Sequence, residues 1–152
     1  VGLANPEIVY IGAIAVEIIE KNLSAEEKNA IRKNVVTYVE DFNKLATLIV
    51  LKQVDAIIGF HFLEGWYPDK AGTIKLKTSE VARIGAGQTA VISYTGNRRG
   101  ADEFILFLSS EEVKAIFRKN HYFGSPDEAF RWIGAKKPIG GEFTAIEGWL
   151  KK

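Results

Sequence analysis

The first twenty residues, VGLANPEIVYIGAIAVEIIE (Val1–Glu20), decide the fold class. Val1 to Ala4 is a short apolar run typical of a strand. Asn5-Pro6 ends it, because proline has no N–H donor and disfavours helical backbone in the residue before it. After Gly12, apolar residues recur at three- and four-residue steps, which predicts one face of a helix. These residues are Ala13, Val16, Ile19 and Leu23. The junction therefore predicts free N–H groups at a helix N-terminus, where an anion can bind.

The composition is that of one ordinary globular domain. The chain has 152 residues, 47% of them apolar and 26% charged, and a net charge of +1. Acidic and basic residues are interspersed, so nothing favours nucleic-acid binding. No stretch approaches the roughly 18 to 20 apolar residues of a membrane span. There is no cysteine, and His61 and His121 lack metal-ligand spacing, so neither a metal site nor a cofactor is predicted.

Local signals place the next elements. Ser24 with Glu27 three residues on predicts a capping box and a short, charged helix. The β-branched and aromatic run Val35–Val39 predicts a strand. Asp41 is placed to cap a helix over about Phe42–Gln53.

The run Val54–Phe60 is mostly apolar and predicts a strand buried on both faces. The order of strands and helices up to this point is typical of a parallel α/β sheet with right-handed crossovers. Ligands bind beyond the carboxyl ends of such strands. Two junctions qualify, Pro6–Gly12 and Glu40–Asn43, and both are predicted to deliver helix N-termini to one sheet edge.

The rest of the chain predicts two more strands and several helices. Thr73–Thr78 alternates like an edge strand, and Gln88–Tyr94 is another strand. Two tryptophans in the last thirty residues indicate that the tail packs against something. The predicted helices are Ala101–Leu108, a second from Ser110 to about Asn120, Ser125–Trp132, and a brief terminal helix around Trp149.

Three segments carry a resemblance to a known family: ANPEIVYIGAIAVEIIE (4–20), VEDFNKLATLIVLKQVDAIIGF (39–60) and GQTAVISYTGNRRGADEFILFLSSEEVKAIFRKNHYF (87–123). Their order and spacing resemble the molybdate/tungstate-type solute-binding proteins of ABC transporters. The first segment matches the family pattern through Asn5, Pro6, Glu7, Gly12, Ala15 and Glu17. The resemblance implies a periplasmic-binding-protein-like (type II) α/β lobe, a mostly parallel sheet flanked by helices, with a C-terminal helical extension.

In that family two lobes close on a tetrahedral oxyanion, and the resemblance implies which residues hold it. The first backbone donor falls at Ile11, with Gly12 beside it. The second falls at Phe42, between Asp41 and Asn43. These placements agree with the two predicted helix N-termini, since N–H groups there hold oxyanions without a counter-charge.

One position departs from the family pattern. The family's tyrosine at the end of a strand falls on Phe60, which has no hydroxyl to donate. Either Tyr10 or His61 takes its place, or the site does not prefer molybdate. Tyr10 is equally consistent with a pocket wall or the core, and His61 with a partly buried structural role. Asp41 is consistent with a plain N-cap, a site residue, or both.

The resemblance also implies an organisation. Residues 1–86 form the ligand-binding lobe, residues 87–123 a return strand and helices that join the other lobe, and residues 124–152 an extension of unassigned role. The expected partners are a small oxyanion, an ABC permease, and either a second copy of the chain or a missing first lobe. The expected location is the periplasm or the outer face of the membrane. The absence of any methionine, even at residue 1, fits a processed or partial chain.

Two other classes of function are weighed. One is a binding-protein-like sensor or interaction domain that acts with a partner chain. The other is an enzyme of the same architecture, which is disfavoured because the sequence has no nucleophile elbow, P-loop or paired carboxylates at a strand end. Binding without catalysis is therefore the preferred hypothesis.

Overall fold

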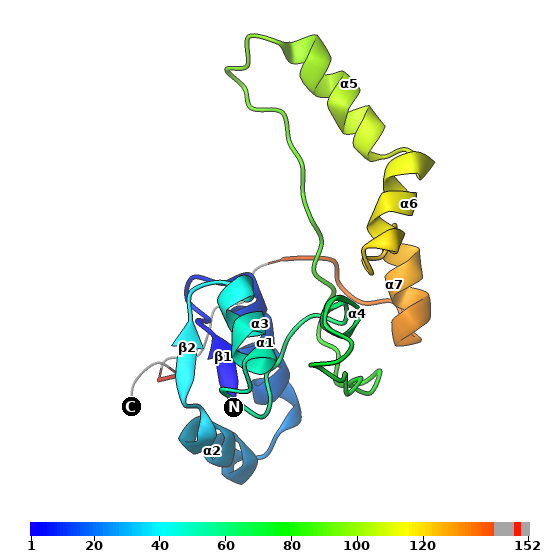
Figure 1. The fold of residues 1–152 in the computed structure, drawn as a ribbon. Coiled ribbons are helices and arrows are strands. Elements are labelled where there is room, and N and C mark those ends of the chain that lie inside the picture. Colours follow the sequence, from blue (N-terminus) through cyan, green and yellow to red (C-terminus); the bar gives the residue numbers. More distant parts are fainter. Residues whose placement is uncertain (142–147, 150–152) are drawn as a thin grey trace.

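The computed structural model describes residues 1–141 and 148–149. Seven helices and two strands make up this part of the chain (Figure 1). The elements are β1 (Gly2–Ala4), α1 (Tyr10–Asn22), α2 (Ala25–Asn34), β2 (Thr37–Val39), α3 (Phe42–Val50), α4 (Leu63–Trp66), α5 (Arg98–Leu108), α6 (Glu111–Lys119) and α7 (Pro126–Ile133). The α/β character is as expected, although the sheet is smaller than the sequence predicts.

The sheet has two parallel strands, with Gly2 opposite Thr37 and Ala4 opposite Val39. The predicted strand Val54–Phe60 is wrong as an element. Only Ile57 forms an isolated parallel bridge to Gly2, and most of the run is not buried. The run Val54–Phe60 has a neighbouring strand, β1, on one side only. Gly59 also lowers its propensity to form a strand.

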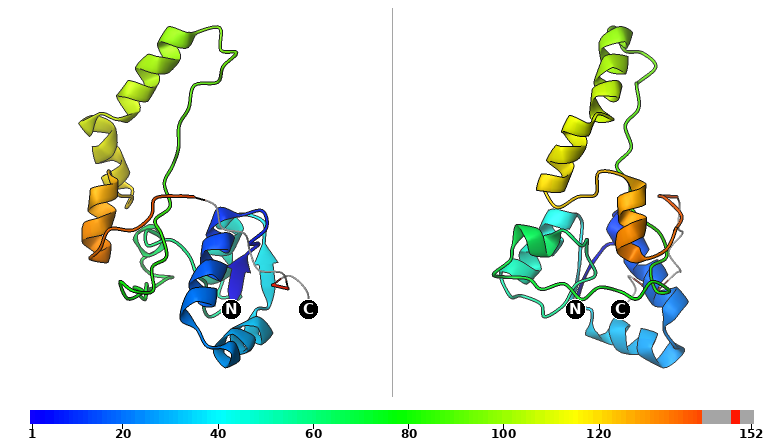
Figure 2. Two further views of the ribbon diagram at one scale, coloured as in Figure 1. Left: turned by 180° about the vertical axis from the view of Figure 1, so that it is seen from behind. Right: turned by 90° about the vertical axis from the view of Figure 1, so that its right-hand side faces the viewer.

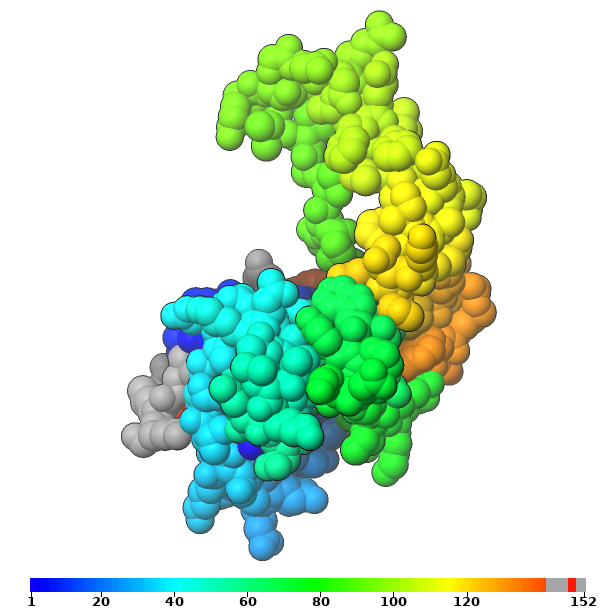
Figure 3. Space-filling view, in the orientation of Figure 1, coloured from blue at the N-terminus to red at the C-terminus, as the bar shows by residue number. Residues whose placement is uncertain are grey.

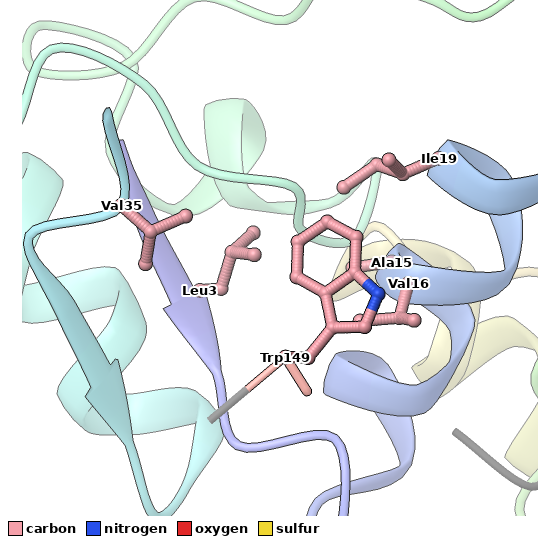
Figure 4. Close-up of a cluster of buried hydrophobic side chains, with 6 residues drawn as sticks. All are labelled: Leu3, Ala15, Val16, Ile19, Val35 and Trp149. Atoms are coloured by element: carbon pink, nitrogen blue, oxygen red, sulfur yellow. The ribbon is translucent and has the colours of Figure 1, made fainter. Parts of the chain in front are cut away.

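Side chains of β1 alternate between two hydrophobic clusters on opposite faces of the sheet, as the pleat requires. Leu3 packs with one side of α1, and Ala4 packs with Leu45 of α3. The Leu3 cluster also holds Trp149 from the end of the chain, which is 3% exposed (Figure 4). The prediction that the tail packs against something is therefore confirmed. The predicted terminal helix lies outside the described residues, apart from Trp149 and its neighbour Gly148.

Helix α1 approaches β1 more closely than a side chain would allow. A Cβ atom on Gly12 would lie 2.3 Å from the carbonyl oxygen of Ala4. The neighbouring atoms are backbone and cannot rotate away. Glycine at this position therefore fixes how α1 packs on the first strand and where its N-terminus lies.

The starts of α2, α3, α6 and α7 are where the local signals predict them, whereas α5 begins at Arg98, three residues before the predicted start at Ala101. The Ser24–Glu27 capping box is complete in α2, and Asp41 caps α3. Ser110 and Ser125 cap α6 and α7 in the same way. These signals act within one helical turn, so the sequence alone specifies them.

The two later strands are absent from the described residues. Thr73–Thr78 lies instead against the end of α7, where the Thr78 hydroxyl donates to the Ile133 carbonyl at 2.7 Å. Gln88–Tyr94 runs without a strand beside it and is largely exposed. A β-strand requires hydrogen bonds to a neighbouring strand, and neither segment has such a neighbour among the described residues.

Residues 88–119 form an arm that stands away from the rest of the molecule (Figures 1 and 2). An extended segment leads out to α5, and α6 leads back towards α7, which lies near α4. We call the remainder, built around β1, β2, α1 and α3, the body.

Candidate ligand-binding site

Both strands of the sheet lead into a helix N-terminus at the same edge. The two connections leave the sheet side by side, because the Asn5 N–H donates to the Val39 carbonyl at 2.8 Å. The α1 and α3 N-termini are the two corners predicted from the sequence. The candidate site is therefore the edge of the sheet where these helices begin.

The α1 corner has no side-chain cap. Val9 is the N-cap residue, in extended conformation, and no side chain bonds to the first turn. Within the described residues, the N–H groups of Tyr10 and Ile11 have no hydrogen-bond partner. The Gly12 N–H is different, since it donates to the Val9 carbonyl at 2.9 Å. The Gly12 N–H, expected to be a donor to the ligand, is therefore used within the first turn, and the first-turn N–H groups left without a partner among the described residues are those of Tyr10 and Ile11.

The α3 corner is capped and carries an acid. Asp41 Oδ1 accepts a hydrogen bond from the Lys44 N–H at 2.7 Å, so the cap assigned from the sequence is present. The N–H groups of Phe42 and Asn43 have no partner in the described part of the chain. The Asp41 carboxylate places negative charge beside these two donors, and the Lys44 ammonium lies 3.9 Å from it.

Aromatic rings line the neighbourhood of both corners. The ring centroids of Phe42 and Phe60 lie 5.0 Å apart, and Phe62 stacks on Phe60 at 5.2 Å. Gly85 lies beside the rings of Tyr10 and Phe60. A Cβ atom placed on it would be 3.5 Å from Tyr10 Cε1 and 3.7 Å from Phe60 Cε1. Three predicted site residues, Tyr10, Phe42 and Phe60, thus lie near one another. Gly85, which lies beside two of them, was not among the predicted site residues.

His61 touches the edge of these rings, with its centroid 5.6 Å from that of Phe62, and packs more closely in a second aromatic cluster. Its ring stacks on Phe123 with centroids 4.2 Å apart, and Trp132 lies 5.4 Å away. Burial lowers the pKa of His61, although a hydrogen bond with the His121 backbone acts in the opposite direction. The partly buried structural role weighed for this histidine fits these contacts.

A buried ion pair holds the segment next to the site in place. Glu17 of α1 is fully buried, and its carboxylate binds the Arg83 guanidinium at 2.7 and 2.8 Å. Arg83 also donates to the Gly140 carbonyl at 2.9 Å. Burial favours a raised pKa for Glu17, but the hydrogen bonds from Arg83 and Lys21 outweigh it and the pKa lies below its usual value.

Sequence reasoning missed this pair as a structural feature. One signal was available: Glu17 directly follows Ile11–Val16, a run of the predicted helix that has no polar side chain. A buried acid in such a helix requires a cationic partner. The identity of that partner, 66 positions along the chain, had no local signal.

One cavity lies away from the candidate site. It has a volume of about 190 Å³ and is formed by the C-terminal half of α1 with Ile31, Ile58 and Leu76. None of the eight predicted site residues lines it. Among the described residues, no three histidine, aspartate or glutamate side chains gather where they would hold a metal ion.

Comparison with protein families gives the class of this chain. Residues 1–123 match the family described as bacterial extracellular solute-binding protein, and the chain belongs to that family. Neither a curated protein nor a solved structure matches the chain. Membership supports ligand binding in transport and a periplasmic or extracellular location, and such proteins are generally non-enzymatic. No helix in the described residues has the length and apolar character needed to cross a membrane.

Proposed function

We propose that the chain binds a small oxyanion for an ABC importer, through backbone N–H groups at the N-termini of α1 and α3. The observation that carries this proposal is the start of α1. Tyr10 and Ile11 present N–H groups without a partner in the described residues, at a helix end that no side chain caps. The positive end of the helix dipole favours a negative ligand there.

The two corners contribute unequally. At α3, Asp41 brings a carboxylate close to the donors of Phe42 and Asn43, which opposes a second negative charge. No acidic residue lies in the first turn of α1. The N–H groups of Tyr10 and Ile11 are therefore the main donors in this proposal, and those at α3 are auxiliary.

The aromatic surroundings bear on which anion is held. Phe60 has no hydroxyl, and His61 is stacked on Phe123. Of the eight predicted site residues, Tyr10 is the one with a side-chain hydroxyl group. Its ring lies next to Gly85. Molybdate and tungstate are the ligands suggested by the family resemblance, and sulfate is the tetrahedral anion that competes with them.

The direct test is titration calorimetry of the chain with molybdate, tungstate and sulfate at low salt. Heat that saturates at one ion per chain for at least one of these anions is expected. Binding of none of the three, even at millimolar anion, removes the oxyanion proposal and leaves the coarser assignment of a solute-binding protein.

A pair of variants at one position tests the backbone mechanism. Tyr10 is the first residue of α1 and follows the extended Val9, a place where proline fits a helix. Tyr10→Pro removes both the side chain and the N–H donor, whereas Tyr10→Ala removes the side chain alone. Hydrogen bonds to charged groups contribute about 1.5–3 kcal/mol. We therefore expect the proline variant to bind roughly 10- to 100-fold more weakly than the alanine variant.

Circular dichroism of both Tyr10 variants is the control, since proline at this position should leave the helix content unchanged. Equal affinities in the two folded variants contradict a role for the Tyr10 N–H. Such a result removes Tyr10 from the donors, even where calorimetry of the unaltered chain shows binding.

A further inference from the structure

We infer that residues 126–141 form a brace that holds the arm in a fixed direction on the body. The brace consists of α7 and the residues that follow it up to Gly141. It binds both segments that connect the arm to the body, which we call the outgoing segment (residues 75–87) and the return segment (residues 120–124). The inference does not depend on the proposed function.

The connections of the arm to the body are weak by themselves. Figure 3 shows the arm reaching away from the body, with open space between α6 and the extended segment. In the outgoing segment, residues 75–79 and 85–87 are all exposed. Segments with few buried contacts open locally at a low cost in free energy. Two such connections allow the arm to rotate about the line that joins them, and a third element bound to both removes this freedom.

The brace forms a backbone bridge with the outgoing segment. The Ile84 N–H donates to the Pro138 carbonyl at 3.0 Å, and the Gly140 N–H donates to the Ile84 carbonyl at 2.8 Å. Next to this bridge, Arg83 donates to the Gly140 carbonyl at 2.9 Å and also binds the buried Glu17. Through Glu17 the bridge is tied to α1 and therefore to the body.

Two further contacts join the end of α7 to the outgoing segment. The Thr78 hydroxyl donates to the Ile133 carbonyl at 2.7 Å. The Lys75 ammonium donates to the Trp132 carbonyl and lies 4.4 Å from the centre of the Trp132 ring. Carbonyl groups in the last turn of a helix lack an intrahelical partner, and the helix dipole favours a cation there. These contacts therefore stabilise α7 as well as the outgoing segment.

One carboxylate of the brace binds the return side of the arm. Glu128 Oε1 accepts hydrogen bonds from the Arg118 guanidinium of α6 at 2.7 and 3.0 Å, and Oε2 accepts one from the Gly124 N–H at 2.8 Å. The Glu128 side chain is 20% exposed, so solvent screens these bonds less than in an ordinary surface pair. Figure 3 shows the resulting position of α7 (orange), directly against α6 (yellow) and against the green part of the body.

The brace follows the part of the chain that the family describes, because the match to the solute-binding family ends at residue 123. Its contacts reach both connections of the arm and, through Arg83, the core of the body. The arm and the body are therefore held as one unit by a segment outside the matched region.

The test is the distance distribution between one spin label on the arm and one on the body, measured by double electron–electron resonance. The chain has no cysteine, so Leu106→Cys on α5 and Asn29→Cys on α2 give two defined labelling sites, both exposed. A single narrow distribution is expected. Glu128→Ala should widen it at least about twofold, because the return side loses its attachment to α7. A broad distribution with Glu128 intact overturns the inference.

Glu103→Ala is the matched control. It removes a carboxylate that pairs with Arg99 at 2.8 Å within α5, and it should leave the distribution unchanged. Arg118→Met breaks the same pair as Glu128→Ala without altering α7, and it should also widen the distribution. An unchanged distribution in either of these two variants, or equal widening by Glu103→Ala, overturns the inference. Circular dichroism of each variant confirms that it is folded.

Discussion

At the scale of single residues, Gly12 shows how one missing side chain positions a candidate binding site. It lies where α1 touches the backbone at the end of β1, and the atoms it faces are the Ala4 carbonyl and the carbonyl carbon of Asn5. Because the helix can move only as a whole, a methyl group at this position would displace the N–H groups of Tyr10 and Ile11 together.

We therefore expect Gly12→Ala to lower the free energy of unfolding by about 1–3 kcal/mol, the usual range for overpacking. Gly72→Ala is the control, since nothing lies within 4 Å of a Cβ atom there, and it should be neutral or slightly stabilising. Urea denaturation of the two variants and the unaltered chain measures both effects. A Gly12→Ala variant as stable as the Gly72→Ala variant contradicts the close approach of α1 to β1.

At the scale of elements, the pair Glu17–Arg83 joins α1 to the segment that passes the candidate site. Arg83 binds Glu17 and the Gly140 carbonyl together, and its neighbour Ile84 bridges to Ile139. Gly85 then lies against Tyr10 and Phe60. The ion pair therefore fixes the position of Gly85 as well as the packing of α1.

Replacing Glu17 by glutamine leaves the Arg83 charge partly buried without its counter-ion, and should cost about 3 kcal/mol of unfolding free energy. Glu40→Gln makes the same change in the exposed Glu40–Lys44 pair, where solvent screens both charges and almost no loss is expected. Thermal or urea unfolding at neutral pH distinguishes the two.

The same pair predicts a dependence on pH. The pKa of Glu17 is lower in the folded state than its usual value, so the folded state binds this proton less readily than the unfolded state does. Its contribution is complete above about pH 4.3 and is lost as the pH falls below that value. The Glu17→Gln variant should therefore lose stability less steeply than the unaltered chain in that acidic range. Parallel curves contradict an ionised, paired Glu17.

At the scale of the whole molecule, the parts predicted from sequence are those that depend on near neighbours. Ser24 with Glu27, and Asp41 with Lys44, form bonds within a single turn, and both helix starts were predicted. A strand needs a partner from elsewhere in the chain. Val54–Phe60 has the composition of a strand but only one bridge to Gly2, so composition alone overestimated the sheet.

The candidate site likewise has some features that local sequence signals predict and others that depend on long-range packing. Its two corners follow from local signals, and the structure has both. Of the two donors expected at α1, Ile11 and Gly12, the Gly12 N–H instead forms a first-turn hydrogen bond to the Val9 carbonyl. The approach of Gly85 to Tyr10 and Phe60 depends on long-range packing, which no periodicity or spacing in the sequence specifies.

Trp149 belongs to this scale because it joins the end of the chain to its beginning. Its indole N–H donates to Glu20 at 2.9 Å, and Arg32 lies over the ring at 4.7 Å. Trp149→Ala should lower the unfolding free energy by about 3–5 kcal/mol. The exposed Tyr94 supplies an aromatic control, and Tyr94→Ala should leave the urea midpoint unchanged. Equal midpoints for the two variants contradict a core position for Trp149.

The place of Trp149 in the core also sets an order of events during synthesis. Glu20 and Trp149 are 129 positions apart, and ribosomes add about 5–20 residues per second. The hydrophobic cluster around Leu3 can therefore be completed only on the order of ten seconds after Glu20 is synthesised, when Trp149 is added. During that time the nascent chain exposes Leu3 and Val16 without their cover, which is when a chaperone or an export machinery can still engage it.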